Sequence, residues 1–204
     1  MDKTILIAGC DGRVGRRTAE LFSQRGWKVA GIDIKGSTDA KVDKFLSVDV
    51  RDVDALNKAI DEIDSQMPIT TLFNTAGYSL DKDFEETDAA EWADLLDTIL
   101  GGSSNLCKAV GPKMVERGDG RIILLSCDYS RQAGDCVNDA VAAGSLHGFA
   151  KSFGVEVAEN NVLVNVLFAN TPLDLDKVAE TVYWLGAIDT YTSAQVVSVT
   201  GSEE

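Results

Sequence analysis

Residues 4–15, TILIAGCDGRVG, decide the fold of this chain. The stretch opens with mostly apolar and β-branched residues, which predict a buried parallel strand over Thr4–Ala8. Gly9, Gly12 and Gly15 follow, where the first helix begins. Glycines there let the backbone turn tightly and approach a pyrophosphate, which would bind the amides of the helix N-terminus. A glycine turn between a strand and a helix therefore predicts an α/β nucleotide-binding fold.

Strands and helices are predicted to alternate along the rest of the chain. Between short apolar runs lie helical patterns; Val178, Val182 and Leu185, for example, share one helix face. This alternation predicts a Rossmann-type, doubly wound parallel sheet with helices on both faces, a three-layer α/β/α architecture. No linker or repeat interrupts the pattern, so we expect one domain over residues 1–204. The seven expected strands are Thr4–Ala8, Lys28–Asp33, Phe45–Val48, Thr70–Asn74, Arg121–Ser126, Val162–Phe168 and Gln195–Val199.

The composition is that of an acidic globular protein. Lys and Arg number 19 against 33 Asp and Glu, which gives a net charge of -14. Such a surface repels phosphate backbones and anionic lipid, which argues against nucleic acid and membrane partners. No apolar run reaches the length of a membrane span, and the first residues lead into a strand without a signal peptide.

The cysteines and the histidine indicate a reduced compartment and no zinc. Cys10, Cys107, Cys127 and Cys136 form no C-x-x-C pair, so we expect a cytoplasmic protein. His147 is the only histidine in the sequence, which argues against a metal site.

Asp33 is the second candidate binding residue. It closes the second predicted strand, 18 residues after Gly15, where a carboxylate accepts hydrogen bonds from ribose hydroxyls. It would also repel a 2'-phosphate, which favours NAD over NADP. Two readings stay open: these residues bind NAD, or they serve only the fold. Arg13, within the glycine turn, could crowd the pyrophosphate.

Beyond the turn, the chain resembles the short-chain dehydrogenase/reductase family over essentially its whole length. Asp49-Val50 matches the family's pair that lines the adenine, and Asn74-Thr75-Ala76-Gly77 matches its N-x-A-G segment. Trp92, Gly120–Ile123, Val164–Val166 and Gln195–Gly201 also sit at family positions. The cofactor-binding positions that the resemblance implies are Gly9, Gly12, Gly15, Asp33, Asp49, Val50, Asn74, Ala76 and Gly77.

The catalytic positions are where the chain departs from the family. Family members use a tyrosine as acid/base, with its pKa lowered by a lysine one helical turn later. These positions hold Asp139 and Ala143 in this sequence, or Ala140 and Gly144 if the register shifts by one residue. Proton transfer needs a group poised near the operating pH. Neither register supplies the pair.

The remaining catalytic positions are also altered. The family's asparagine position holds Ile99, and its serine position falls on Ser126 or Cys127, so a hydroxyl could survive there. The Pro-Gly that lies against the nicotinamide has become Ala169-Asn170. The resemblance therefore implies an adenine half that is kept, a nicotinamide half that is dismantled, and no catalytic residues.

Two further features bear on the substrate. Thr171–Asp174 passes almost directly into a helix near Asp176, which leaves no room for the family's substrate lid. Tyr78 and Lys82 spell Y-x-x-x-K, but they follow the fourth strand. We interpret them as a chance match, in a loop that the family topology places away from the catalytic pair.

The leading hypothesis is a non-catalytic subunit that assembles with a catalytically intact, NAD-dependent alcohol dehydrogenase paralogue, as a hetero-oligomer that is expected to be a heterotetramer. The partner's expected substrate is a β-hydroxyacyl-CoA of aromatic hydrocarbon degradation. Small residues in 101–104 and 140–145 suit a helix-bundle interface between subunits, although they also suit packing against the sheet.

Two alternatives remain. The chain could be an NAD(H) sensor that uses the glycine turn, Asp33 and Asp49. It could also be an unconventional enzyme that uses Ser126, Cys127 or Asp139, with Asp128 and Tyr129 nearby. Against the second alternative, no histidine or lysine is expected at an activating position, and an unassisted hydroxyl or thiol is a poor nucleophile.

Overall fold

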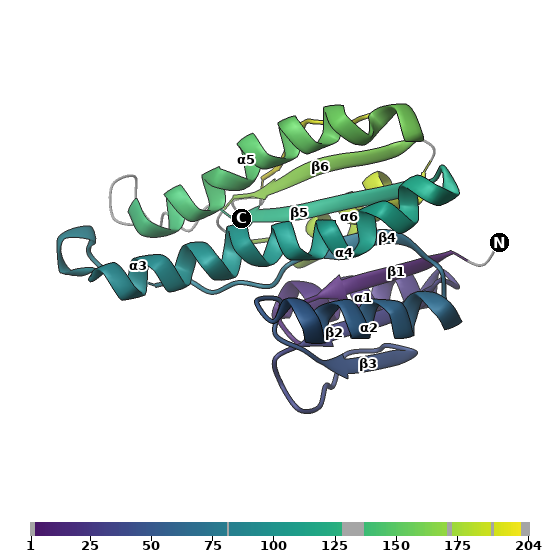
Figure 1. Cartoon of the computed structure of the whole chain (residues 1–204), viewed down its shortest axis with the longest axis horizontal. Helices are drawn as coiled ribbons and strands as arrows, with labels where there is room; N and C mark the ends of the chain where they lie inside the picture. Colours follow the sequence, from purple (N-terminus) through teal and green to yellow (C-terminus); the bar gives the residue numbers. More distant parts are fainter. Residues whose placement is uncertain (1–2, 81, 128–136, 171–172, 189, 201–204) are drawn as a thin grey trace.

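A parallel β-sheet runs through the centre of the molecule (Figure 1). The structure is a computed structural model that describes residues 3–80, 82–127, 137–170, 173–188 and 190–200. The strands are β1 (Thr4–Ala8), β2 (Lys28–Asp33), β3 (Lys44–Ser47), β4 (Ile69–Asn74), β5 (Gly120–Cys127), β6 (Val162–Ala169) and β7 (Val196–Val199). They form one seven-stranded sheet in the order β3-β2-β1-β4-β5-β6-β7, with every neighbouring pair parallel. The expected fold class is therefore confirmed.

The direction of winding reverses between β1 and β4. From β1 the sheet extends through β2 to β3 on one side, and from β4 to β7 on the other. Ala8 and Asn74, the last residues of β1 and β4, lie side by side. In open α/β sheets ligands bind outside the carboxyl ends of the strands at such a switch point. The topology thus fixes where a site belongs.

Helices cover both faces of the sheet. Figure 1 shows α2, α4 and α5 on one face, and α1 and α6 on the other. A short turn of π-helix, Asp97–Gly101, joins α3 to α4, and 3-10 turns span Phe84–Glu86 and Ala158–Asn160. The helices are α1 (Arg13–Gln24), α2 (Val53–Gln66), α3 (Ala89–Leu96), α4 (Gly102–Arg117), α5 (Val137–Val157) and α6 (Leu175–Ala187).

Two hydrophobic cores lie on the two faces of the sheet, and β1 contributes to both. Ile5 and Ile7 pack in the core under α1 and α6, whereas Leu6 and Ala8 pack in the core under α2, α4 and α5. All four side chains are fully buried. A strand buried on both faces has no polar positions, which explains why its sequence does not alternate.

The predicted elements agree with the structure to within a residue or two. The bounds of β1 and β2 are as predicted, whereas β3 begins at Lys44 and ends at Ser47, one residue earlier than expected at each end. The first helix begins at Arg13, because Gly12 serves as its N-cap. Among the described residues, no helix combines the length and apolarity needed to cross a membrane.

The glycine turn gives a test of this packing. A Cβ at Gly15 would lie 2.8 Å from the Cα of Cys10, whereas a Cβ at Gly12 would meet only the carbonyl oxygen of Gly9, at 3.3 Å. We expect Gly15→Ala to lower the free energy of unfolding by about 2–3 kcal/mol, and Gly12→Ala by less than about 1 kcal/mol. Denaturant titration of the two variants measures this difference. Equal losses would contradict the assignment of Gly15 as the packing glycine.

Candidate functional site

A cavity of about 410 Å³ opens at the carboxyl ends of β1, β2 and β4. It lies at the switch point of the sheet, where the topology predicts a ligand site. Gly9 and Gly12 line it from the glycine turn, and Asp33 from the end of β2. The other lining residues are Ile32, Ile34, Lys35, Val48, Asp49, Val50, Arg51, Thr75, Ala76, Gly77, Tyr78, Asp94 and Thr98.

The glycine turn forms the floor of this cavity. Gly9 has a φ of 75°, and a Cβ on it would lie 2.8 Å from the amide nitrogen of Ala76, so only glycine fits. The amide of Gly12 donates to the carbonyl of Gly9 at 3.1 Å. Arg13 is exposed and does not line the cavity, so the expected crowding is not seen. Among the described residues, no side chain covers the backbone above Gly12 at the start of α1. This uncovered stretch, the glycine cradle, suits a phosphate.

Asp33 stands at the cavity wall with a fixed orientation. Its carboxylate accepts hydrogen bonds from the backbone amides of Asp11, at 3.0 Å, and Lys35, at 3.3 Å. A carboxylate has about four lone-pair positions, so acceptor capacity remains for a ribose hydroxyl.

Asp11, inside the glycine turn, organises the loop after β2. It is only 6% exposed, and its carboxylate contacts Lys35 Nζ at 2.6 Å and Arg16 at 2.8 Å. It also accepts from Thr38 Oγ1 and from the amide of Asp39. Hydrogen bonds from Lys35 and then Arg16 hold the pKa of Asp11 well below its usual range. The anchored loop places Lys35 beside the cavity. Local sequence patterns do not single out Asp11, because most of its partners lie in the loop that follows β2.

The far wall of the cavity is a polar bridge. The Arg51 guanidinium donates hydrogen bonds to the Asp49 carboxylate, the shortest at 2.7 Å. It also donates to Asp94 on α3, at 2.7 Å. The Tyr78 hydroxyl donates to the other Asp94 oxygen at 2.6 Å. Burial, together with this bond to Asp94, raises the pKa of Tyr78 to about 12, and Arg51 lowers the pKa of Asp49. The bridge joins three segments that are distant in sequence before any ligand binds.

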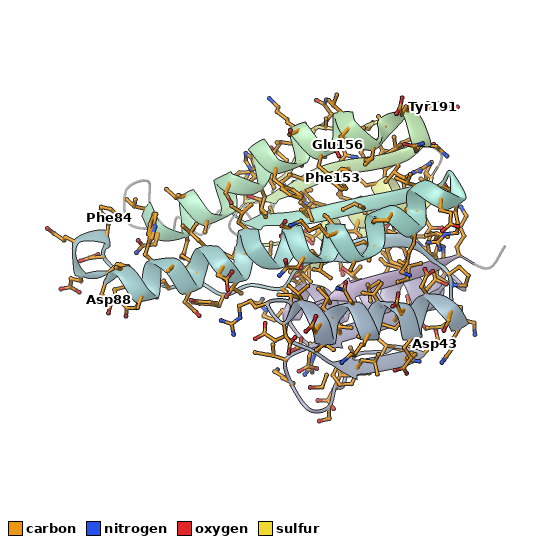
Figure 2. All side chains as sticks on the ribbon, in the orientation of Figure 1. Asp43, Phe84, Asp88, Phe153, Glu156 and Tyr191 are labelled. Carbon is orange, nitrogen blue, oxygen red and sulfur yellow. The ribbon has the colours of Figure 1, made fainter. Side chains whose placement is uncertain are left out.

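Asp139, the residue at the expected tyrosine position, is sealed inside the protein. It is 1% exposed and accepts hydrogen bonds from the Ser79 hydroxyl and, at 3.0 Å, from the amide of Leu80. The preceding Asn138 donates to the carbonyl of Lys82 at 3.0 Å and to Thr87 Oγ1 at 2.7 Å. The first turn of α5 therefore holds in place the segment after β4, in which Figure 2 labels Phe84 and Asp88.

This contact corrects the expectation that the Tyr78–Lys82 loop lies away from the catalytic region. The loop lies directly against Asp139, because β4 and β5 are neighbours in the sheet and their following segments meet. Tyr78 and Lys82 nevertheless do not form a pair. Tyr78 bonds to Asp94, and Lys82 forms an ion pair with Glu91 at 2.7 Å.

Ser126 has an unexpected neighbour. Its hydroxyl lies 3.2 Å from the carbonyl of Ala143, to which it donates, and 3.1 Å from Nε2 of His147. The sequence did not predict this contact, which arises because His147 follows Ala143 by one helical turn on α5. Burial, with a smaller effect of Lys151, lowers the pKa of His147.

The Ser126–His147 contact does not make an accessible nucleophile. Ser126 is 1% exposed, so its hydroxyl is enclosed between the Ala143 carbonyl and the imidazole and does not face the large cavity. Cys127 ends β5, but its side chain lies outside the described part of the chain, as do Asp128 and Tyr129.

The expected lysine and asparagine positions are filled by apolar side chains. Ile99 and Ala143 are buried, and with their neighbours they enclose a space of only about 10 Å³. Asn74, beside this space, donates to Ser103 Oγ at 2.8 Å and accepts from the amide of Ala76 at 3.0 Å. Asn74 therefore shapes the N-x-A-G turn and does not line the large cavity.

The connection from β6 to α6 is short. Ala169 ends β6 and Leu175 begins α6, so only residues 170–174 lie between them. Asp174 caps α6 by accepting from the amides of Asp176 and Lys177, both at 3.1 Å. As the sequence predicts, a lid helix has no room there. The described residues contain no group of three or more side chains suited to a metal ion.

Seven of the nine predicted binding residues line the large cavity. Gly15 and Asn74 do not, because they pack behind it. The residues that the sequence did not identify are Asp11, Lys35, Arg51, Tyr78, Asp94 and Thr98.

Comparison with known proteins agrees with this architecture. The solved structure of ElxO with NADP bound superposes with a TM-score of 0.89 at 19% identity, covering 98% of each chain, which shows the shared fold. Nodulation protein G of Azospirillum brasilense is 31% identical over 179 residues, 81% of this chain and 72% of that protein. The 3-oxoacyl-[acyl-carrier-protein] reductase FabG of Escherichia coli (strain K12) is 29% identical over 174 residues, 81% of this chain and 71% of that protein. The short chain dehydrogenase family model matches residues 3–172, and the chain therefore belongs to this family of oxidoreductases.

Proposed function

We propose that this chain is a non-catalytic member of the family that binds an adenine nucleotide and does not transfer hydride. The observation that carries the proposal is the burial of Asp139, which accepts hydrogen bonds from Ser79 and Leu80. A general acid or base must reach the reacting oxygen. Asp139 instead binds the segment after β4 through the hydroxyl of Ser79 and the amide of Leu80.

The neighbouring positions support the same conclusion. Ala143 supplies no ammonium to lower the pKa of an acid, and Ile99 supplies no polar group for a water. Ser126 is buried with its hydroxyl bonded to the backbone. One relative in the comparison is named as a reductase, so a direct assay with that relative as the positive control is decisive.

The binding half of the proposal rests on the large cavity. Its floor is the glycine cradle, in which a Cβ at Gly12 would meet only Gly9 within 4 Å. Asp33 offers a carboxylate to ribose hydroxyls, and the Asp49-Val50 segment lies where the resemblance puts the adenine. These residues fit the adenine half of NAD. Asp33 would repel a 2'-phosphate, which favours NAD over NADP.

Asp139 gives the first test. Asp139→Leu leaves the Leu80 amide without its acceptor and should lower the free energy of unfolding by about 2 kcal/mol. Asp139→Asn keeps one acceptor oxygen and should stay within about 1 kcal/mol of the parent. Denaturant titration measures both values.

Turnover is measured on the same proteins. With NADH or NADPH and a 3-oxoacyl thioester, the parent chain should oxidise no nucleotide above the rate without protein, while the E. coli reductase turns over. Turnover by the parent that disappears in Asp139→Asn would refute the non-catalytic assignment.

Gly12 gives the second test. A methyl group at Gly12 would project over the cradle, while its φ of -72° suits alanine. Gly12→Ala should therefore weaken NAD binding about tenfold with little loss of stability. The matched control is Gly148→Ala on α5, where added atoms meet nothing within 4 Å. Calorimetric titration compares the three proteins, and equal affinities would argue against a phosphate on this turn.

A second candidate role is a non-catalytic subunit bound to an intact family member. One face of α5 carries Val137, Val141, Gly144, Gly148 and Val155, all exposed, with Val155 at 73%. Their spacing puts them on one side of the helix. Exposed Lys151 lies on the same side, so the face offers a partner helix small and apolar residues together with one positive charge.

The small residues of α4 do not contribute to such a face. Gly102 packs against Val50, and Ser103 bonds to Asn74, so both serve the interior of the chain. Ala142 and Ala143 are buried as well. We therefore place the proposed interface on the exposed residues of α5. The 2-[hydroxy(phenyl)methyl]succinyl-CoA dehydrogenase of anaerobic toluene degradation is one heteromeric enzyme that such a subunit would suit.

Gly148 also tests this second role. Because the space around it is open, Gly148→Ala should raise the free energy of unfolding by about 0.5–1 kcal/mol, and Gly148→Leu should not unfold the chain. If α5 binds an intact paralogue encoded in the same genome, co-expressed and co-purified, Gly148→Leu should abolish the co-purification. Separate elution of the parent chain and the paralogue would refute the subunit role.

A further inference from the structure

We infer that this chain recognises its ligand through the adenosine diphosphate portion alone, so ADP-ribose binds as tightly as NAD. The inference rests on the proposed nucleotide site and names its ligand class. It differs from what a redox site requires, because a hydride-transferring site must also hold the nicotinamide ring.

Hydrogen bonds within the chain fix the side chains at the adenosine end of the cavity. Arg51 joins Asp49 to Asp94, and Tyr78 bonds to the same Asp94, so the outer wall of the cavity is braced from three segments. Asp33 is oriented by the amides of Asp11 and Lys35. Groups that are already fixed lose little conformational freedom on binding, which favours affinity at this end.

The opposite end is closed among the described residues. Beyond Gly77, the side chains of Ile99, Leu125 and Leu146 enclose about 10 Å³. A space of that size holds about one water molecule and no aromatic ring. Ile99 also covers Gly77 closely, since a Cβ on Gly77 would lie 3.4 Å from Ile99 Cγ1.

A second layer lies over the former catalytic position. Ser79 and Leu80 bond to Asp139, and Asn138 holds Lys82 and Thr87, so main chain from the segment after β4 covers the first turn of α5. A ring directed toward α5 would have to displace this segment and leave Asp139 buried without partners. Displacing this segment costs more free energy than a weak contact to nicotinamide contributes.

The chemistry of the large cavity is therefore that of an adenosine diphosphate site. It offers the N-terminus of α1 above Gly12 for phosphate, a carboxylate for ribose, and the Asp49–Arg51 pair with apolar walls for the base. The nicotinamide half of a dinucleotide gains no pocket from the described residues, so it remains in solvent.

Calorimetric titration of the full chain tests this inference with four probes: ADP, ADP-ribose, NAD and nicotinamide mononucleotide. The dissociation constants for ADP-ribose and NAD should agree within about threefold, and nicotinamide mononucleotide should give no binding heat. NAD binding more than about tenfold tighter than ADP-ribose would overturn the inference while leaving nucleotide binding itself intact. If no adenine nucleotide bound, the proposed function would fail together with the inference.

Saturation-transfer NMR gives an independent readout without a variant. With NAD in excess over the protein, the adenine protons should receive saturation from the protein and the nicotinamide protons should not. Comparable saturation of both rings would overturn the inference. The result does not depend on catalytic activity, and it separates a bound adenine half from a fully bound dinucleotide.

Discussion

The close approach of the glycine turn to the segment after β4 is the constraint on which the rest of this structure depends. At Gly9 the backbone has a positive φ and lies against Thr75 and Ala76 with no room for a Cβ, and at Gly15 the first turn of α1 packs on Cys10. These contacts hold β1, α1 and β4 together at the point where the winding of the sheet reverses. The cavity lies at this reversal, and it is lined by Asp33 at the end of β2, by Asp49 after β3 and by Gly77 after β4. The scaffold of the cavity is thus part of the core of the fold.

The residues that form the fold and the cavity are different from those at the expected catalytic positions. The glycine cradle is made by backbone geometry that the core requires, and the opposite wall of the cavity is made by side chains that bond to one another. The tyrosine and lysine of a working enzyme are side chains on the surface of a cleft, and replacing them leaves the sheet intact. In this chain the replacements pack well: Ile99 and Ala143 are buried, and Asp139 has two hydrogen-bond donors.

The sequence predicted the sheet, the glycine cradle and Asp33 because each rests on local signals. Short apolar runs mark β1 and β2, and the glycine spacing marks the turn between a strand and a helix. The remaining parts of the site come from contacts between distant segments. Arg51 meets Asp94, Asp11 meets Lys35, and His147 meets Ser126 only after the chain has folded. Local patterns carry no signal for such pairs, and the placing of the loop after β4 against α5 was missed for the same reason.

The anchoring of one loop by Asn138 and Asp139 also has an evolutionary consequence. A single change of Asp139 to tyrosine would put a phenol ring where the Ser79–Leu80 main chain now lies, and it would remove the acceptor that this main chain needs. Asn138, with its two bonds to Lys82 and Thr87, would still hold the loop down. A tyrosine at this position therefore requires accompanying changes in the segment after β4, so the position is constrained by its hydrogen-bond partners and cannot vary alone.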